Sequence, residues 1–243
     1  MTALFHGADL CRAPHRDDCP WCGSTRLRTR LHTDGFTLDA CGDCAHAFQN
    51  PGLLHYPYQG RPRRGRLLAT ARAMLPFPEP ESWLDVGTGE AAFPEVAKEV
   101  FPYTSFDGVD ATARVEWART AGHLEEAYTG ELTDPHLTAH LRARYDVVSV
   151  LHHLHRTPDP REEVRAALTA LRPGGHLLLE LPDPGSAFAA LLGRWWHPRT
   201  RPGHLVPRSN LRAELAEQSC TLVTTTRCDF SRAYRIIARK QLA

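Results

Sequence analysis

The sequence predicts a doubly wound α/β fold, a mostly parallel sheet covered by helices, that follows a small cysteine-rich module. Three observations predict it. From Trp83 onward, short apolar or β-branched segments alternate with helix-like stretches, as strands and helices do in such folds. The first 50 residues carry two close cysteine pairs instead. A connector rich in proline, glycine and arginine, residues 51–66, separates the two parts, so we place the boundary near residue 55.

The expected elements follow in order along the chain. Five strands are predicted at residues 82–86, 105–110, 125–130, 145–151 and 176–182. Helices are predicted between them at residues 90–100, 112–121, 135–143 and 161–171. The tail adds an amphipathic segment at 210–218 and two strands at 221–226 and 234–238, which we expect to form an antiparallel pair at the sheet edge.

Composition excludes several classes of protein. The 243 residues hold 29 Lys+Arg and 28 Asp+Glu, a net charge of +1, which is too small to recruit nucleic acid or an anionic membrane. A hydrophobic share of 42% argues against wholesale disorder. No apolar stretch approaches the roughly 18 residues of a membrane span, so we expect a soluble, cytoplasmic protein. The seven unevenly placed cysteines favour reduced thiols or a metal site over a disulfide scaffold.

The cysteine pairs predict a structural zinc site. The two Cys-x2-Cys knuckles are separated by 18 residues, and four thiolates can complete a tetrahedron around zinc; the ligands are Cys19, Cys22, Cys41 and Cys44. Between them, residues 27–32 and 36–39 flank an Asp-Gly turn, so a hairpin is expected and the module is a zinc ribbon. The metal would supply most of its folding free energy. Two alternatives remain: a redox dithiol at Cys-Pro-Trp-Cys, and replacement of one ligand by Cys11, His15 or His46.

A glycine-rich loop follows the first strand of the sheet. Asp85 precedes Gly87 and Gly89, and these glycines allow a sharp turn and close approach of a ligand at the carboxyl end of the strand. An acid in that place would repel pyrophosphate and favours a cationic or sugar-bearing ligand. Asp110 ends the second strand, 21 residues after Gly89, where a carboxylate can accept both hydroxyls of a ribose.

In this order and spacing, these motifs resemble the class I S-adenosylmethionine-dependent methyltransferases, whose fold is Rossmann-like, over residues 76–243. Further matches are Asp-Val-Val-Ser-Val-Leu-His-His-Leu-His from residue 146, Pro-Asp-Pro from 158, and Leu-Arg-Pro-Gly-Gly-His-Leu-Leu-Leu-Glu from 171. Cys-Pro-x-Cys-Gly, the second cysteine pair and Phe-Gln-Asn-Pro at 48–51 resemble the zinc-ribbon leader of some bacterial methyltransferases that modify small molecules, including sugars and natural products. The division expected is a ribbon at 1–55, a linker that covers the cofactor at 56–75, and a methyltransferase domain at 76–243.

The resemblance implies a set of cofactor-binding residues. Asp85, Gly87 and Gly89 would line the methionine end of the cofactor. Asp110 would hold the ribose, and Glu131 would lie near the adenine amine. Leu151 and His152 would pass beside the cofactor. Two positions depart from the family pattern. Ala91 stands where the family loop has its third glycine, and Glu131 stands where aspartate is common. At Ala91 the single added methyl group should be tolerated.

Methyl transfer needs in-line positioning in a site without water, and an oxygen or carbon acceptor also needs a general base. Histidine suits that task, and the candidates are His152, His153 and His155 after the fourth strand and His204. The stretch around His204 resembles a segment that enters the substrate pocket of related enzymes. Trp195 and Trp196 would wall that pocket or simply pack, and Tyr56 and Tyr58 would cover the cofactor or anchor the linker.

The leading hypothesis is methyl transfer to an oxygen, nitrogen or carbon atom of a small metabolite, in natural-product biosynthesis, without a membrane or nucleic-acid partner. A ribosomal or other RNA methyltransferase is the second hypothesis, because four arginines of the connector could contact phosphate: Arg61, Arg63, Arg64 and Arg66. The third is a non-catalytic adaptor that binds a partner through its zinc ribbon. The sequence leaves the oligomeric state open.

Overall fold

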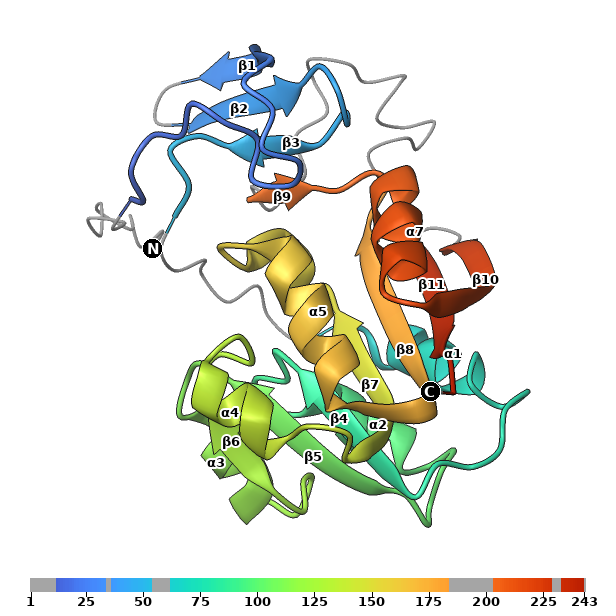
Figure 1. Ribbon diagram of the computed structural model, residues 1–243. Coiled ribbons are helices and arrows are strands. Elements are labelled where there is room, and N and C mark those ends of the chain that lie inside the picture. The colour runs from blue at the N-terminus through green and yellow to red at the C-terminus, as the bar shows by residue number, and fades with distance from the viewer. Residues whose placement is uncertain (1–11, 34–35, 54–61, 184–202, 229–232, 243) are drawn as a thin grey trace.

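The computed structural model describes residues 12–33, 36–53, 62–183, 203–228 and 233–242. In this part of the chain a seven-stranded sheet forms the body of the molecule, with the strand order β10-β11-β8-β7-β4-β5-β6 (Figure 1). Its members are β4 (Ser82–Val86), β5 (Ser105–Asp110), β6 (Ala127–Thr129), β7 (Tyr145–Leu151), β8 (Leu171–Pro182), β10 (Cys220–Cys228) and β11 (Ala233–Lys240). Strands β4 to β8 are parallel, and β11 and β10 add antiparallel edges. The predicted sheet and its antiparallel edge are confirmed.

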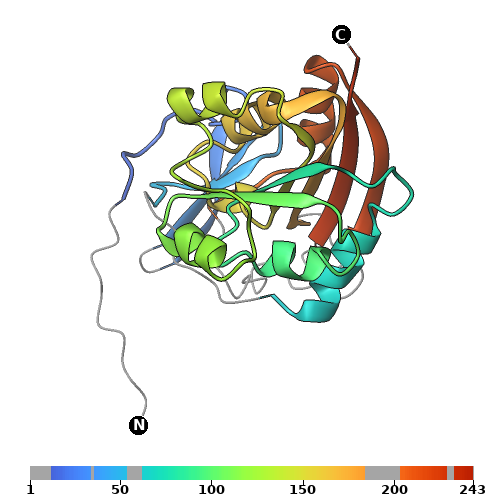
Figure 2. The same ribbon diagram turned by 90° about the horizontal axis from the view of Figure 1, so that it is seen from below.

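Helices cover both faces of this sheet, which explains why its central strands are continuously apolar. Figure 2 shows α1 (Arg64–Arg72), α2 (Ala92–Ala97) and α3 (Arg114–Thr120) on one face, and α4 (Pro135–His140), α5 (Pro160–Ala170) and α7 (Arg208–Glu217) on the other. Trp83 is fully buried on the first face, among Phe93, Phe101 and Phe106. Among the described helices, none combines the length and the apolar character that crossing a membrane requires.

The order of the strands locates a ligand crevice. From β4 the chain adds β5 and β6 on one side, then crosses to β7 and β8 on the other. Ligands of open α/β sheets bind outside the carboxyl ends of the strands at such a switch point. The loops after β4 and β7 therefore meet there, and both carry residues that the sequence singles out.

Two helix boundaries differ from expectation in an informative way. Asp159 caps α5 by accepting hydrogen bonds from the amides of Arg161 and Glu162, both at 3.0 Å, so the helix begins at Pro160. The sequence also predicts an extended connector up to residue 66, but the structure forms α1 from Arg64. The apolar side chains of Leu67 and Ala71, one turn apart, are buried against the α2 side of the core, and this burial outweighs the local Arg-Gly composition.

The N-terminal ribbon is a four-stranded antiparallel sheet. Strands β1 (Leu27–Thr33) and β2 (Phe36–Cys41) form the predicted hairpin, and β3 (Ala47–Gln49) pairs with β2. The fourth strand, β9 (His204–Leu205), comes from the far end of the chain and pairs with β3 (Figure 1). The sequence did not predict this long-range strand pairing, because a strand of two residues is too short to produce a recognisable pattern.

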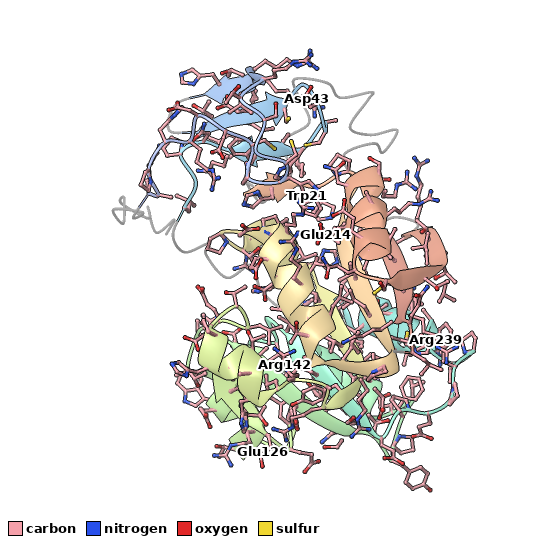
Figure 3. The ribbon with its side chains drawn as sticks, in the orientation of Figure 1. Trp21, Asp43, Glu126, Arg142, Glu214 and Arg239 are labelled. Atoms are coloured by element: carbon pink, nitrogen blue, oxygen red, sulfur yellow. The ribbon has the colours of Figure 1, made fainter. Side chains whose placement is uncertain are left out.

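An arginine fastens the ribbon to the body of the molecule. Nη1 of Arg161, in the first turn of α5, donates to the backbone carbonyl of Trp21 in the first knuckle at 3.1 Å. The same guanidinium pairs with the buried carboxylate of Glu214 on α7, and Arg165 donates to that carboxylate at 2.7 Å. Trp21 and Glu214 mark this junction in Figure 3. The first knuckle is thus held against two helices of the sheet domain.

Candidate active site

The glycine-rich loop folds over the end of β5. The amides of Gly87 and Thr88 donate to the carbonyl of Val109 at 2.9 and 3.2 Å. Gly87 has a φ of 68°, and a Cβ there would lie 2.2 Å from Nδ1 of His153, so the imidazole packs directly on the glycine. Glycine is needed at this position for its backbone conformation and for the space taken by His153.

Asp110 links this loop to the second strand. Its carboxylate accepts hydrogen bonds from the amide of Gly89 at 2.9 Å and from the amide and hydroxyl of Thr112 at 2.8 and 2.6 Å. Each carboxylate oxygen can accept more than one hydrogen bond, so capacity remains for the hydroxyls of a ligand. The two motifs that the sequence places 21 residues apart are therefore in direct contact.

A pocket of about 420 Å³ opens beside these residues. It lies between the glycine loop, the ends of β5 and β6, and the segment that leads into α5. Its lining includes four of the residues expected to bind the cofactor, Gly87, Gly89, Asp110 and Glu131, together with Thr88, Arg114, His153, Arg156, Thr157, Pro158 and Glu163. Two buried polar atoms in this wall lack a hydrogen-bond partner in the described part of the chain, Oγ1 of Thr88 and Oε1 of Glu163.

The other two expected cofactor residues do not line this pocket. Asp85 is buried below the loop and accepts a hydrogen bond of 2.6 Å from the hydroxyl of Ser149, which in turn accepts one from Nε1 of Trp83. Burial raises the pKa of Asp85 to about 6. Leu151 is partly buried and packs on the core. Both residues thus support the loops that line the pocket.

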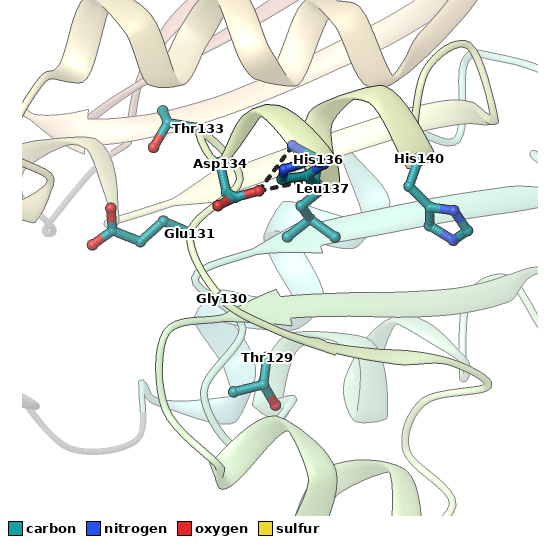
Figure 4. Close-up of a pocket in the computed structure, with 8 residues that line it drawn as sticks. All are labelled: Thr129, Gly130, Glu131, Thr133, Asp134, His136, Leu137 and His140. Carbon is teal, nitrogen blue, oxygen red and sulfur yellow. Dashed lines mark hydrogen bonds between the residues drawn. The ribbon is translucent and has the colours of Figure 1, made fainter.

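A second pocket, of about 680 Å³, continues from the first through Gly130 and Glu131. Figure 4 shows its wall, in which the Glu131 carboxylate extends away from the helix that carries His136 and His140. Asp134 caps that helix by accepting hydrogen bonds from the amides of His136 and Leu137 at 2.9 and 3.1 Å. Glu131 therefore lies where the two pockets join.

Of the histidine candidates, His153 lines the pocket. Its Nε2 is 3.6 Å from Oε1 of Glu163, a buried carboxylate on α5. The sequence did not identify Glu163, although a signal existed: it is a charge on the apolar face of the predicted helix, beside Val164 and Ala167.

His152, the preceding residue, faces a different group of side chains. Its Nε2 lies 3.2 Å from Oε2 of the buried Glu180 and also contacts the guanidinium of Arg66. Burial, together with the nearby charges of Arg66 and Arg235, lowers the pKa of His152 to about 3. His155 is buried next to it, and burial lowers its pKa as well. Both imidazoles are neutral near pH 7.

His204 belongs to the ribbon in this structure. It lies on β9, buried, with its ring stacked on His46 at a centroid distance of 5.2 Å and its Nδ1 3.2 Å from Nε2 of His46. Burial lowers its pKa to about 4. It is absent from the lining of both described pockets, and its segment forms a sheet edge where the sequence suggests a substrate-pocket wall.

The four predicted thiol ligands come together in the ribbon. All four sulfurs lie within 4.8 Å of one another, and the close pairs, each at 3.6 Å, are Cys19 with Cys44 and Cys22 with Cys41. Four sulfurs at about 2.3 Å from one zinc ion would be about 3.8 Å apart, so the donor set fits this metal. The close pairs run between the knuckles, which differs from the pairing within one Cys-x2-Cys that a redox dithiol needs.

The alternative ligands are not part of this thiol group. His46 lies beside it, with Nδ1 3.8 Å from the sulfur of Cys19, but its other ring nitrogen faces His204. His15 lies near Asn50 instead. Cys11 is outside the described residues, as are Tyr56, Tyr58, Arg61, Trp195 and Trp196.

The connector arginines do not face one surface. Arg64 pairs with Glu99 on the outside, whereas Arg66 turns inward to Glu180 and His152. Arg64 and Arg66 therefore do not form one continuous basic patch at the connector.

Comparisons with known proteins agree with this geometry. Residues 59–225 match the family model described as a methyltransferase domain. Over 96 residues the chain is 33% identical to a ubiquinone biosynthesis O-methyltransferase from Cronobacter sakazakii, a match that spans 39% of this chain and only 39% of that relative.

Solved structures show the same fold. An O-methyltransferase family protein from Burkholderia thailandensis superimposes with a TM-score of 0.53 and 17% identity, covering 74% of this chain and 60% of that one. Magnesium protoporphyrin IX methyltransferase from Synechocystis was solved with bound S-adenosylhomocysteine. It superimposes with a TM-score of 0.56 and 14% identity, covering 76% of this chain and 90% of that one. At these identities the likeness concerns the fold alone.

Proposed function

We propose that this chain, which belongs to the methyltransferase-domain family, is an S-adenosylmethionine-dependent methyltransferase that methylates an oxygen, nitrogen or carbon atom of a small metabolite. The observation that carries this proposal is the contact between the glycine-rich loop and Asp110 at the mouth of one pocket. Synthesis of a natural product is the context that the ribbon leader suggests.

The pocket fits the cofactor chemically. S-adenosylmethionine supplies an electrophilic methyl group on a positively charged sulfur. We assign the ribose hydroxyls to Asp110, which retains acceptor capacity, and the adenine amine to Glu131 at the junction of the two pockets. Gly87 and Gly89 let the methionine portion approach the backbone. The side chains of Thr88 and Glu163 are further polar groups in the lining.

The charges of the lining also match. The cofactor carries an ammonium, a sulfonium and one carboxylate, hence a net positive charge. The lining contains three carboxylates, those of Asp110, Glu131 and Glu163, and two guanidiniums, those of Arg114 and Arg156. Asp85 supports the loop from below, through its hydrogen bond with Ser149.

We assign the general base to His153 rather than to His152 or His204. His153 lines the pocket, and Glu163 stands near its Nε2, where a carboxylate stabilises the imidazolium that forms when the acceptor loses its proton. His152 and His204 have pKa values of about 3 and 4, too low for efficient proton abstraction near pH 7.

The zinc ribbon has a structural part in this proposal. Four thiolates leave no open coordination position for catalysis. Through Trp21 and Arg161 the ribbon instead holds the start of α5, and Thr157 and Pro158 just before this helix line the pocket. The RNA and adaptor hypotheses lack a comparable observation.

Calorimetric titration with S-adenosylhomocysteine tests the proposal. We expect micromolar binding by the wild type and a loss of about 10- to 100-fold in Asp110→Ala, because hydrogen bonds to a charged group contribute roughly 1.5–3 kcal/mol. Glu116→Ala, which removes an exposed carboxylate from α3 outside the lining, is the matched control and should bind like the wild type. Absence of binding to a folded wild type would refute methyl transfer by this chain.

A further inference from the structure

Building on the proposed function, we propose that the acceptor carries a carboxylate group and that Arg66 binds this group beside the methyl-transfer pocket. The site is the Glu180 cluster, defined as Arg66, Thr70, His152, Glu180 and Arg235. These five residues come from four separate elements or loops, and no single stretch of the sequence contains them all.

The Glu180 cluster lies on the half of the sheet that the cofactor pocket leaves free. That pocket follows the ends of β4, β5 and β6, whereas Glu180 lies near the carboxyl end of β8, paired with Leu151 at the end of β7. The amide of His152 donates to the carbonyl of Glu180 at 2.8 Å. His153, the next residue, lines the cofactor pocket, so one peptide unit separates the two sites.

Arg235 alone satisfies most of the Glu180 carboxylate. It is the cross-strand neighbour of Glu180 on β11, and its Nε and Nη2 both donate to Oε1, at 2.9 and 2.5 Å. Nη2 also donates to the hydroxyl of Thr70 at 2.9 Å, and that hydroxyl donates to Oε1 at 2.9 Å. This ion pair is buried, hydrogen-bonded and electrically complete.

Arg66 is then a surplus positive charge. Its Nη2 lies 3.4 Å from Oε2 of Glu180, a long contact, and its Nε is buried without a hydrogen-bond partner in the described part of the chain. The imidazole of His152 is neutral at pH 7 and supplies no negative charge. The Glu180 cluster therefore contains two guanidiniums and one carboxylate, a net charge of +1, in a largely buried place.

A carboxylate is the ligand that would complete this arrangement. A guanidinium pairs with a carboxylate through two parallel N–H donors, and the partly exposed guanidinium of Arg66, whose buried Nε has no hydrogen-bond partner in the described part of the chain, is the group that can form such a pair. The net charge of +1 matches a group of charge −1 better than a dianionic phosphate. Arg66 is reachable from solvent, since 31% of its side chain is exposed, whereas only 13% of the Arg235 side chain is.

The next carboxylate along the chain also lies near two guanidiniums. Asp183, also buried, has Arg227 at 3.2 Å and Arg208 at 3.7 Å. Within the described part of the chain, four guanidiniums thus lie near two carboxylates around the carboxyl end of β8. This local field favours an anionic acceptor, although the chain as a whole is nearly neutral.

The test measures binding of matched carboxylate and amide probes to the enzyme saturated with S-adenosylhomocysteine. The pairs are benzoate with benzamide, 3,4-dihydroxybenzoate with its amide, and hexanoate with hexanamide, titrated by ligand-observed NMR or calorimetry. We expect at least one carboxylate to bind ten times or more tightly than its amide. In Arg66→Gln this preference should fall to within about twofold of equality.

Arg72→Gln is the matched control, because it removes an exposed arginine from the last turn of the same helix. It should retain the preference for the carboxylate. S-adenosylhomocysteine affinity, measured in all three proteins, reports whether the fold and the cofactor site are intact and should not differ among them.

The outcomes separate the two proposals. If the wild type binds S-adenosylhomocysteine but no carboxylate is preferred, or if the preference survives in Arg66→Gln, the carboxylate proposal is overturned and the methyltransferase proposal stands. Tighter binding of phenyl phosphate than of benzoate would equally overturn the choice of a carboxylate. If the wild type fails to bind S-adenosylhomocysteine, the function itself is refuted and this inference falls with it.

Discussion

Among the described residues, carboxylates outnumber guanidiniums in the pocket wall at the ends of β5 and β6, whereas guanidiniums outnumber carboxylates near the ends of β7 and β8. The two halves of one sheet thus suit ligands of opposite charge, a cationic cofactor and an anionic acceptor. His153 lies between them. Opposite fields on the two sides of the reacting atoms would orient both substrates before the reaction, which is where much of the acceleration of methyl transfer arises.

The largest expected effect is that of metal removal, which should separate the ribbon from the cofactor half of the sheet. We expect one zinc ion per chain, and we expect a chelator or Cys41→Ser to unfold the ribbon, since structural zinc contributes on the order of 10 kcal/mol to small metal modules. Hydrogen exchange over residues 27–49 and the zinc content measure this loss. S-adenosylhomocysteine affinity should fall less than tenfold, because Asp110 and the glycine loop are held by hydrogen bonds within the seven-stranded sheet and its loops.

Cys220→Ser is the control for thiol loss, because Cys220 is a buried cysteine on β10, outside the thiol group. It should keep its zinc and its ribbon protection. A chain that contains no metal, or that loses the ribbon and the cofactor site to the same extent, would contradict the independence of the ribbon and the cofactor site.

Glu180→Gln addresses the half near β8. It leaves the guanidiniums of Arg66 and Arg235 without a counter-charge, and breaking a buried pair in this way costs about 3–5 kcal/mol of unfolding free energy. Glu217→Gln removes an exposed partner of Arg161 and should cost less than about 1 kcal/mol. Urea unfolding measures both. Equal costs would mean that the Glu180 cluster is an ordinary surface network.

Asp85 should make the half near β4 sensitive to pH. Because burial raises its folded-state pKa to about 6, from about 3.9 in the unfolded chain, the folded state binds this proton more tightly. The resulting stabilisation is complete below about pH 4 and is lost as the pH rises through about 6, a change of roughly 3 kcal/mol. Asp85→Asn should remove this pH dependence. Parallel stability curves for the two proteins between pH 4 and 7 would exclude the effect.

Gly87→Ala should weaken cofactor binding by about thirtyfold, roughly 2 kcal/mol, because the new Cβ would lie 2.2 Å from His153 at a φ of 68°. Gly122→Ala provides the control. Its φ is 79°, but a Cβ there meets nothing within 4 Å, so it shares the backbone strain without the clash. Calorimetry with S-adenosylhomocysteine compares the two. Equal affinities in the two variants would show that contact with His153 has no role.

The two halves also differed in how far the sequence predicted them. The half near β4 and β5 depends on residues close to strand ends, so Gly87, Gly89 and Asp110 could be placed from a pattern of strands and glycines. The Glu180 cluster joins residues far apart in the chain, for example Arg235 and Thr70, which are 165 positions apart and share a hydrogen bond. Only the fold brings such residues together.

Two functional residues that the sequence analysis missed could have been recognised from the apolar residues around them. Glu180 and Glu163 are single charges in otherwise apolar segments, a strand and a helix face, and such a charge requires a partner. The sequence showed the need for a partner without showing which residue satisfies it. The sequence contained no comparable sign of the true position of His204, because a histidine in a loop is equally compatible with a pocket wall and with a strand of two residues.

The pairing of β3 with β9 has a consequence for the synthesis of the chain. About 155 residues separate Gln49 from His204, so a ribosome adding roughly 5–20 residues per second needs about 10–30 s to make the second after the first. During that interval β3 presents an unpaired edge, the kind of surface on which nascent chains aggregate. The ribbon sheet is therefore completed only after most of the seven-stranded sheet has been synthesised.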